Sequence, residues 1–307
     1  MRVMMAGASG FLGTKLAARL RAGGHEVVRL VRRPAAAPDE VSWDPDAGRL
    51  DPAAVATAGA VVNLAGTPLG LRVGRMQLPV RPWTRRYRRQ FVTSRIGTTT
   101  VLAGAIARAD PRPAVFLNGS ATGWYGDTGD EVVDERSPAR PDGFLTRNAH
   151  EWEAATGPAG ASGVRVVMLR TGFPLHRDGG YLGPQLLPFR MGLGGKVGSG
   201  RQWQPWISLA DWLEAAVLLL HRDDIAGPVN MVGPTPATNA EFTRVLAGLL
   251  HRPALMPLPG PLLTLLVGEF GRDALASRRL LPSVLLEAGF TFTHPDLESA
   301  LRAALFS

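Results

Sequence analysis

The chain has 307 residues, 45% of them hydrophobic, which is enough to bury one large core or two smaller ones. It has no cysteine, which excludes disulfides, thiolate metal sites and cysteine nucleophiles, and its six histidines show no ligand spacing, so we expect no metal site. The net charge of +8 comes almost entirely from arginine, and together with abundant alanine, glycine and proline it indicates a compositional bias.

The first predicted strand, Val3 to Ala6, leads into the sequence G-A-S-G-F-L-G at 7 to 13. Leucines then recur at helical spacing, and Val27 to Val31 reads as a second strand. Glycines at intervals of three let the backbone turn sharply and approach a pyrophosphate, with the N–H groups of the next helix facing the phosphates. The alternative is a hairpin whose glycines have no ligand role. We predict a dinucleotide-binding turn made by Gly7, Ser9, Gly10, Phe11, Leu12 and Gly13.

Arg32 and Arg33 follow the second strand, at the place about 20 residues beyond the turn where a chain that binds NAD carries an acidic residue. A guanidinium keeps its charge and binds phosphate through a planar fork, which suits the 2′-phosphate of NADP. We therefore predict NADP in preference to NAD. The alternative is that both arginines only solvate a loop.

Arginines also cluster around Trp83 and Tyr87, which raises a nucleic-acid partner as an alternative. They are Arg72, Arg75, Arg81, Arg85, Arg86, Arg88, Arg89 and Arg95. We favour a solvated helix face and expect no nucleic acid. The apolar run from Leu262 to Val267 is too short to span a bilayer, and glycines interrupt the N-terminal apolar run, so we expect no membrane contact, no signal peptide and a cytoplasmic protein.

Apolar segments recur with helical stretches between them, which predicts an α/β fold with a doubly wound parallel sheet of the Rossmann type. The later candidate strands are Ala60 to Ala65, Ala114 to Leu117 and Val164 to Leu169. Each ends in small or polar residues. Since ligands bind beyond the carboxyl ends of parallel strands, we expect these ends to converge on one crevice.

We expect a Rossmann domain over residues 1–172, with return segments near 206–232, and a smaller C-terminal substrate domain over 173–307. Helices are predicted at 211–220, 239–250 and 297–305. The glycine-rich segment 179–200 reads as a mobile lid, and an ordered surface connection is the alternative.

Several further sequences follow the glycine turn in a characteristic order. They are V-V-N-L-A-G at 61 to 66, S-R-I-G-T-T at 94 to 99, S-A-T-G-W-Y-G at 120 to 126, L-R-T-G at 169 to 172, G-L-G-G-K-V-G-S-G at 192 to 200, W-I-S-L-A-D at 206 to 211 and G-F-T-F-T-H-P-D at 289 to 296. This order resembles the extended short-chain dehydrogenases/reductases, and more closely their atypical epimerase-like branch with a C-terminal domain of unknown function.

The resemblance implies a role for single residues. The three turn glycines would hold the pyrophosphate and Arg32 the 2′-phosphate. Asn63, Ala65 and Gly66 would line the adenosine side, and Thr171 and Gly172 would touch the nicotinamide. Ser120 matches the serine that hydrogen-bonds the reacting carbonyl or hydroxyl, with a strand-terminating turn serine as the alternative.

The chain departs from this superfamily in its proton-transfer residues. There a tyrosine moves the proton, and a lysine four residues later lowers its pKa, whereas segment 144–153 here contains neither residue. Tyr125 is the best candidate acid/base, with an aromatic packed under the nicotinamide or against Trp124 as the alternative. Other candidates for the missing groups are Glu151, Glu153 and Lys196, with an exposed helix face for the glutamates and a solvated loop lysine as the alternatives.

We therefore predict an NADP-dependent oxidoreductase or epimerase that acts on a hydroxyl/carbonyl pair of a small polar metabolite such as a sugar nucleotide. A homodimer is left open. Because the usual tyrosine and lysine are missing, a catalytically silent NADP-binding sensor or interaction protein is the alternative.

Overall fold

The computed structural model describes residues 1–68, 71–73, 76–78, 84–140 and 143–306. Of the arginine-rich segment, Arg75, Arg81 and Trp83 lie outside the described residues, as does the side chain of Arg72.

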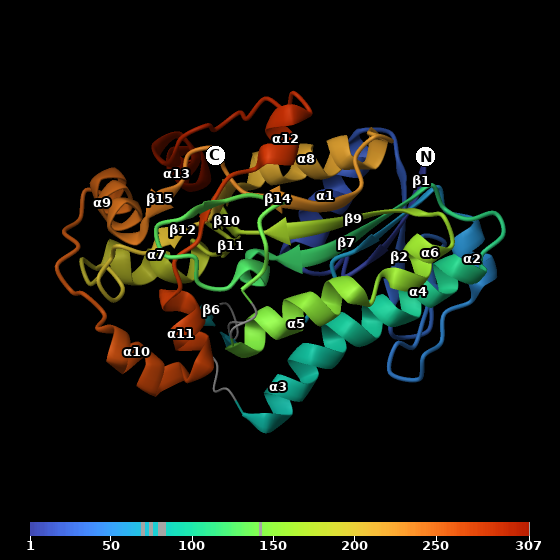
Figure 1. The fold of residues 1–307 in the computed structure, drawn as a ribbon, viewed down its shortest axis with the longest axis horizontal. Helices are drawn as coiled ribbons and strands as arrows, with labels where there is room; N and C mark the ends of the chain where they lie inside the picture. The colour runs from blue at the N-terminus through green and yellow to red at the C-terminus, as the bar shows by residue number, and fades with distance from the viewer. Residues whose placement is uncertain (69–70, 74–75, 79–83, 141–142, 307) are drawn as a thin grey trace.

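A seven-stranded parallel sheet forms the centre of the molecule (Figure 1). In spatial order its strands are β14 (Gly227–Met231), β9 (Arg165–Thr171), β7 (Val115–Ala121), β4 (Ala60–Asn63), β1 (Arg2–Ala6), β2 (Glu26–Val31) and β3 (Glu40–Ser42). The chain order reverses between β1 and β4, and ligands of such sheets bind beyond the carboxyl ends of the strands at this switch point. The predicted α/β fold of the Rossmann type is confirmed.

Helices cover both faces of this sheet (Figure 1). They are α1 (Phe11–Ala22), α8 (Leu209–His221) and α12 (Ser283–Glu287) on one face, and α2 (Pro52–Ala56), α4 (Thr98–Arg108) and α6 (Gly157–Ala161) on the other. Successive residues of a strand point to opposite faces, so Val3 and Met5 of β1 lie in one core cluster and Met4 and Ala6 in the other. Both faces of β1 are therefore buried, as its continuous apolar sequence predicts.

A smaller lobe lies beyond the carboxyl ends of the strands, on the left of Figure 1. Its core joins β10 (Phe173–His176), α7 (Gly183–Arg190), β13 (Trp206–Ser208), α9 (Asn239–Leu250) and α13 (Leu297–Phe306). Thr238 and Glu241 form a reciprocal capping box at the start of α9. The helices expected after residue 205 are present with nearly the predicted bounds, and α8 packs against the large sheet.

Apart from α5, the remaining elements have eight residues or fewer. They are β5 (Leu71–Val73), β6 (Met76–Leu78), α3 (Arg85–Val92), a π-helical turn (Thr93–Gly97), a 3-10 turn (Thr122–Tyr125), β8 (Val132–Val133), α5 (Gly143–Ala154), β11 (Gly179–Gly180), β12 (Trp203–Gln204), β15 (Ala237–Thr238), α10 (Gly260–Val267), α11 (Glu269–Leu275) and β16 (Arg279–Leu280). None of the helices in the described part of the chain is long and apolar enough to cross a membrane.

The glycine-rich segment 179–200 is built into the smaller lobe. It contains α7, and isolated bridges join Leu193 to Ala254 and Val197 to Leu258. The Leu258 N–H donates to the Lys196 carbonyl at 2.9 Å. The segment is therefore an ordered connection in this structure.

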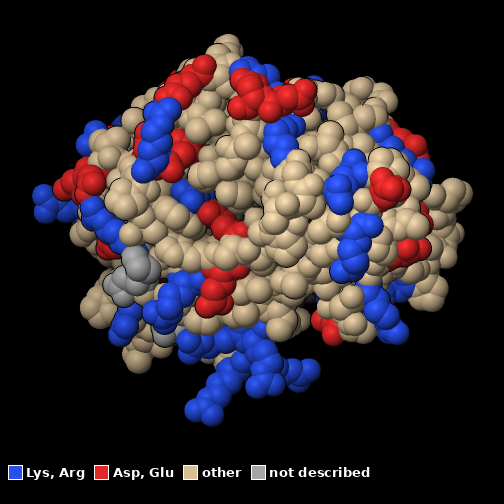
Figure 2. Space-filling model, turned by 45° about the vertical axis from the view of Figure 1, so that its right-hand side comes forward, with Lys and Arg blue, Asp and Glu red and all other residues tan. Residues whose placement is uncertain are grey.

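The arginine-rich helix α3 presents a basic face to solvent. Tyr87 and Phe91 are buried beneath it, while Arg85, Arg86 and Arg89 are exposed. Figure 2 shows a group of basic side chains at the lower edge of the molecule, where α3 lies in Figure 1.

Candidate functional site

The three glycines of the turn between β1 and α1 meet different surroundings. Gly7 has φ +77°, and a Cβ there would lie 2.4 Å from the Leu64 carbonyl carbon. A Cβ on Gly13 would lie 2.1 Å from the Gly7 carbonyl oxygen. A Cβ on Gly10 would approach only that same oxygen, at 3.3 Å. The outer two glycines are thus required by backbone packing, whereas Gly10 leaves open the space that a pyrophosphate needs.

The neighbours of these glycines hold the turn in place. Ser9 is exposed and Leu12 packs against the core under α1. Phe11 lies against the smaller lobe, because a Cβ on Gly179 would come within 2.6 Å of its ring. The Phe11 and His176 rings are 5.8 Å apart. The phenyl ring therefore ties the turn to the smaller lobe.

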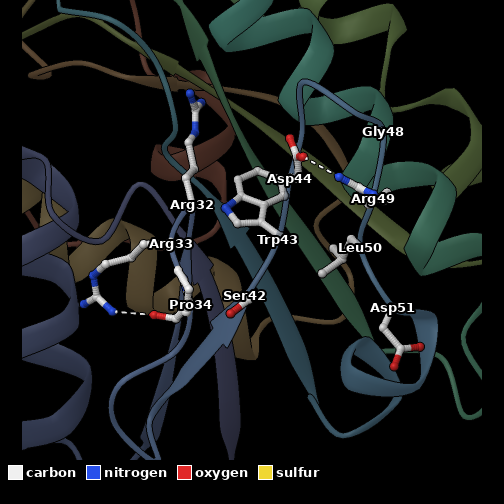
Figure 3. A pocket seen from close by; sticks show the side chains of 10 residues that line it. All are labelled: Arg32, Arg33, Pro34, Ser42, Trp43, Asp44, Gly48, Arg49, Leu50 and Asp51. Carbon is white, nitrogen blue, oxygen red and sulfur yellow. Dashed lines mark hydrogen bonds and ion pairs between the residues drawn. The ribbon is translucent and has the colours of Figure 1, made fainter.

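Arg32 and Arg33 point to different sides of a cavity of about 720 Å³ at the ends of β2 and β3 (Figure 3). Arg33 donates to both carboxylate oxygens of Glu40, at 2.8 and 2.7 Å. This hydrogen bond is the main reason why the pKa of Glu40 falls to about 2. Arg32 makes no ion pair or side-chain hydrogen bond within the described ranges, so its guanidinium remains available to an anion.

A buried polar network shapes the floor of the crevice between β4 and β7. The Asn63 amide donates to Thr99 Oγ1 at 2.9 Å and to Asn118 Oδ1 at 2.8 Å, and its oxygen accepts from the Ala65 N–H at 3.1 Å. The Trp152 indole donates to the same Thr99 hydroxyl at 2.9 Å. Asn63 is fully buried, so it sets the path of the loop after β4, and exposed Gly66 forms the surface there.

Thr171 and Gly172 lie where β9 turns into β10. The Thr171 hydroxyl accepts from the Trp212 indole at 3.2 Å. A Cβ on Gly172 would lie 2.0 Å from the Pro205 carbonyl oxygen, so this glycine is required by the close approach of the two backbones.

Ser120 is the second-to-last residue of β7 and lies beside an ion pair. Its hydroxyl donates to Glu153 Oε1 at 2.6 Å, and Arg170 binds both oxygens of Glu153 at 2.9 Å. Arg170 also lies 3.5 Å above the Trp124 ring. Burial lowers the pKa of Arg170, but Glu153 and Tyr125 outweigh it, so that the pKa is raised and the group stays charged.

Tyr125 lies beneath this pair and is fully buried. Its hydroxyl donates to Asn230 Oδ1 at 2.8 Å and accepts from Arg170 Nη1 at 2.9 Å. Burial raises the pKa of Tyr125 to about 12. Ser120 and Tyr125 are thus linked through Glu153 and Arg170, and the tyrosine is the more deeply buried of the two.

The sequence analysis missed Arg170 and Asn230 as members of this site. An arginine inside the apolar strand β9 is the one local signal, because a buried charge requires a partner. Glu151 and Lys196, the other candidates, are both exposed.

Ser208, Asp211 and His294 also meet, but as an anchor for the chain. The Ser208 hydroxyl caps α8 and donates to the Asp211 carboxylate at 2.6 Å. His294 Nδ1 lies 3.1 Å from the same hydroxyl oxygen. The Asp211 carboxylate also accepts the backbone N–H groups of Thr293 and His294. This cluster fastens the segment before α13 to the start of α8.

Comparisons with known proteins agree with this architecture. Residues 3–150 match the NAD dependent epimerase/dehydratase family, and residues 258–304 match a domain of unknown function, DUF1731. Epimerase family protein Mb2239 of Mycobacterium bovis is 41% identical over 300 residues, which cover 97% of this chain and 96% of that protein.

Solved structures extend the likeness to three dimensions. The crystal structure of human epimerase family protein SDR39U1 with NADPH has a TM-score of 0.88 and 34% identity, and the match covers 99% of both chains. UDP-N-acetylglucosamine 4-epimerase from Bacillus cereus shares the fold alone, with a TM-score of 0.74, 14% identity and coverage of 99% and 98% of the two chains.

The resemblance seen in the ordered sequence motifs is therefore confirmed over nearly the whole length. Both the N-terminal NAD(P)-binding part and the C-terminal domain of unknown function are present. The chain belongs to the epimerase family, as a member of the NAD dependent epimerase/dehydratase family that carries a C-terminal DUF1731 domain.

Proposed function

We propose that the protein binds NADPH at the switch point between β1 and β4 and acts on a hydroxyl/carbonyl pair of a polar metabolite such as a sugar nucleotide. The observation that carries the choice of cofactor is the available Arg32 guanidinium at the cavity beside β2 and β3. The open space at Gly10 fits a pyrophosphate. The NADPH in the structure of the human relative supports the same assignment.

Arg32→Ala is expected to weaken NADPH binding by about 10- to 100-fold, because one charge-assisted contact contributes on the order of 1.5–3 kcal/mol. NADH has no 2′-phosphate, so its affinity should stay unchanged. The matched control is Arg33→Ala, which should keep the preference for NADPH because Arg33 is engaged by Glu40. Titrations of both cofactors by tryptophan fluorescence at fixed salt measure these affinities. Equal losses in the two variants would contradict the assignment to Arg32.

The bound nicotinamide would supply or accept a hydride, and the protein must supply the contacts to the reacting oxygen. We assign this contact to Ser120, because a hydroxyl that donates to Glu153 can still accept a hydrogen bond from a substrate hydroxyl. Tyr125 has both of its hydrogen bonds satisfied within the protein. It is therefore a positioning residue that holds Arg170, and through it Glu153.

Ser120→Ala is expected to reduce turnover by about 100-fold, because it removes the hydroxyl that contacts the reacting oxygen of the substrate. The affinity for NADPH should stay unchanged. Tyr125→Phe should instead lower the free energy of unfolding by about 1–3 kcal/mol, because the buried Asn230 Oδ1 and one N–H group of Arg170 each lose a hydrogen-bond partner. Turnover is followed by NADPH absorbance and unfolding by urea titration. A Tyr125→Phe variant that is fully stable but inactive would make the phenol a reacting group.

A binding protein without catalysis is the second candidate, and a specific observation favours it. The Glu153 carboxylate, to which Ser120 donates, is bound by Arg170 through both oxygens, and the Tyr125 phenol is fully buried. This candidate predicts tight NADPH binding, no oxidation against a broad panel of carbonyl compounds, and no incorporation of solvent deuterium into sugar nucleotides.

A further inference from the structure

The net positive charge of the chain comes from one stretch of its sequence. Residues 52–109 contain nine arginines and no lysine, aspartate or glutamate. The whole chain has 34 basic and 26 acidic side chains, so the rest of it has 25 basic and 26 acidic ones and a net charge of −1. A compositional bias spreads arginine along a whole sequence, so it does not explain this concentration.

Helix α3 brings three of these arginines to the surface at one place. Arg85, Arg86 and Arg89 are exposed, and none of them forms an ion pair with a residue of the described ranges. An exposed arginine elsewhere is paired, as Arg302 is with Glu298. Basic side chains protrude from the lower edge of the molecule in Figure 2, where α3 lies in Figure 1, with no acidic side chain among them.

The placement of these arginines costs helix stability. Helix α3 begins at Arg85 and has no acidic residue in its first turn, where the positive end of the helix dipole disfavours cations. Arg85 and Arg89 are four residues apart, so their like charges also repel each other. Glutamate or glutamine would form a solvated helix face without these costs. Such a local conflict is typical of a functional surface, to which a ligand brings the missing anions.

The chemistry of this surface suits phosphate groups better than a membrane or a protein. Tyr87 and Phe91 of α3 are only 2% and 4% exposed, and the Tyr87 hydroxyl donates to the Pro68 carbonyl. No large hydrophobic side chain is exposed in the described part of residues 52–109. Insertion into a bilayer surface and the core of a protein interface both need such side chains. Interfaces with nucleic acid are instead polar and strongly positive, and the guanidinium fork matches phosphate.

We propose that α3 binds the phosphodiester backbone of double-stranded nucleic acid through Arg85, Arg86 and Arg89. A duplex is favoured over a single strand, because binding of single strands depends on exposed aromatic rings that stack on bases, and Tyr87 and Phe91 are buried. Phosphate contacts carry no sequence information, so the binding is independent of base sequence. This activity goes beyond the chemistry proposed at the switch point and does not depend on it.

The test measures fluorescence anisotropy of labelled duplexes of about 20 base pairs, with two unrelated DNA sequences and one RNA sequence, between about 50 and 200 mM NaCl. Both DNA sequences should bind equally. Three phosphate contacts predict a slope of about −2.7 for log affinity against log salt, which is a loss of about 40-fold over this range. The variant Arg85→Gln/Arg86→Gln/Arg89→Gln should bind at least about tenfold more weakly at the lower salt, with a slope near zero. The RNA duplex shows whether DNA or RNA supplies the phosphates.

Two matched variants serve as controls. Replacing the same three residues of α3 with lysine keeps their charge and should keep the salt dependence. The variant Arg201→Gln/Arg244→Gln/Arg252→Gln removes an equal charge from exposed arginines of the smaller lobe and should bind like wild type. Glutamine has nearly the helix propensity of arginine, so every variant should melt like wild type when unfolding is followed by circular dichroism.

Several results would overturn the proposal. Wild type would bind no duplex, the glutamine variant of α3 would bind like wild type, or the control in the smaller lobe would lose as much affinity, which makes net charge the cause. Tighter binding to phosphatidylserine vesicles or to poly-glutamate than to either kind of duplex would assign α3 to a membrane or to an acidic protein. Weakened NADPH binding in the glutamine variant would assign the arginines to the cofactor instead.

Discussion

Replacing Gly10 with valine is expected to abolish NADPH binding, with an affinity loss of at least about 100-fold, while the fold persists. A Cβ at this position meets only the Gly7 carbonyl oxygen at 3.3 Å, so the free protein accommodates it with a small shift. The two γ-methyl groups of valine then occupy the space at the start of α1 that the pyrophosphate must enter. Fluorescence titration measures the binding, and circular dichroism during heating measures the fold.

Two other glycines provide matched controls for this experiment. Gly13→Ala places a Cβ 2.1 Å from the Gly7 carbonyl oxygen, so it should destabilise the turn itself and lose stability and binding together. Gly104→Ala in α4 meets only the flexible end of Arg108 at 3.5 Å, so it should raise helix stability by about 0.5–1 kcal/mol and leave binding intact. If Gly10→Val binds NADPH normally, the phosphate site lies elsewhere.

The central sheet could be predicted from sequence because its middle strands are buried on both faces and therefore read as continuous apolar runs. The two outermost strands escaped prediction for physical reasons. β3 has only three residues, and β14 begins with Gly227 and Pro228 and contains the polar Asn230, so neither has an apolar run. Their places in the sheet follow from pairing with β2 and β9, which no local pattern encodes.

The site was predictable only where its chemistry is local. The glycine turn and the arginine pair after β2 are short segments that spacing alone locates, and their contacts with a cofactor stay predictions. The pairing of Arg33 with Glu40 depends on the register of β2 against β3, so the sequence could not distinguish the two arginines. The contacts of Arg170 could not be predicted either, because they join β9 to α5 and to the turn after β7, which are far apart in the sequence.

Buried polar contacts near Tyr125 join the edge strand β14 to Glu135 and to the segment that leads into α12. The Asn230 amide donates to the Leu281 carbonyl at 2.9 Å, and Glu135 accepts the N–H groups of Asn230 and Ser283. Burial raises the pKa of Glu135. The Tyr125 hydroxyl thereby connects the ion pair of Arg170 and Glu153 with the segment that leads into α12. A change at this ion pair should therefore lower the free energy of unfolding of the whole protein.

Glu153→Ala is therefore expected to lower the free energy of unfolding by about 3–5 kcal/mol, because it leaves a buried guanidinium without its counter-ion. The Arg170 and Glu153 side chains are only 3% and 10% exposed. Urea unfolding monitored by tryptophan fluorescence reports the loss, since Trp124 lies directly under Arg170. Ser120 should also lose its acceptor, so that any turnover falls beyond the effect of instability alone.

Two comparisons make this last prediction specific to the buried charge. Glu298→Ala breaks an ion pair whose side chains are 59% and 60% exposed, and it should change stability by about 0.5 kcal/mol or less. The double variant Glu153→Leu/Arg170→Met replaces the pair with apolar groups of similar size and should recover most of the stability lost in Glu153→Ala, because no unpaired charge remains. If Glu153→Ala behaves like Glu298→Ala, the guanidinium of Arg170 is stabilised by Trp124 and Tyr125 without Glu153, and the carboxylate is then free to serve Ser120 as a proton acceptor.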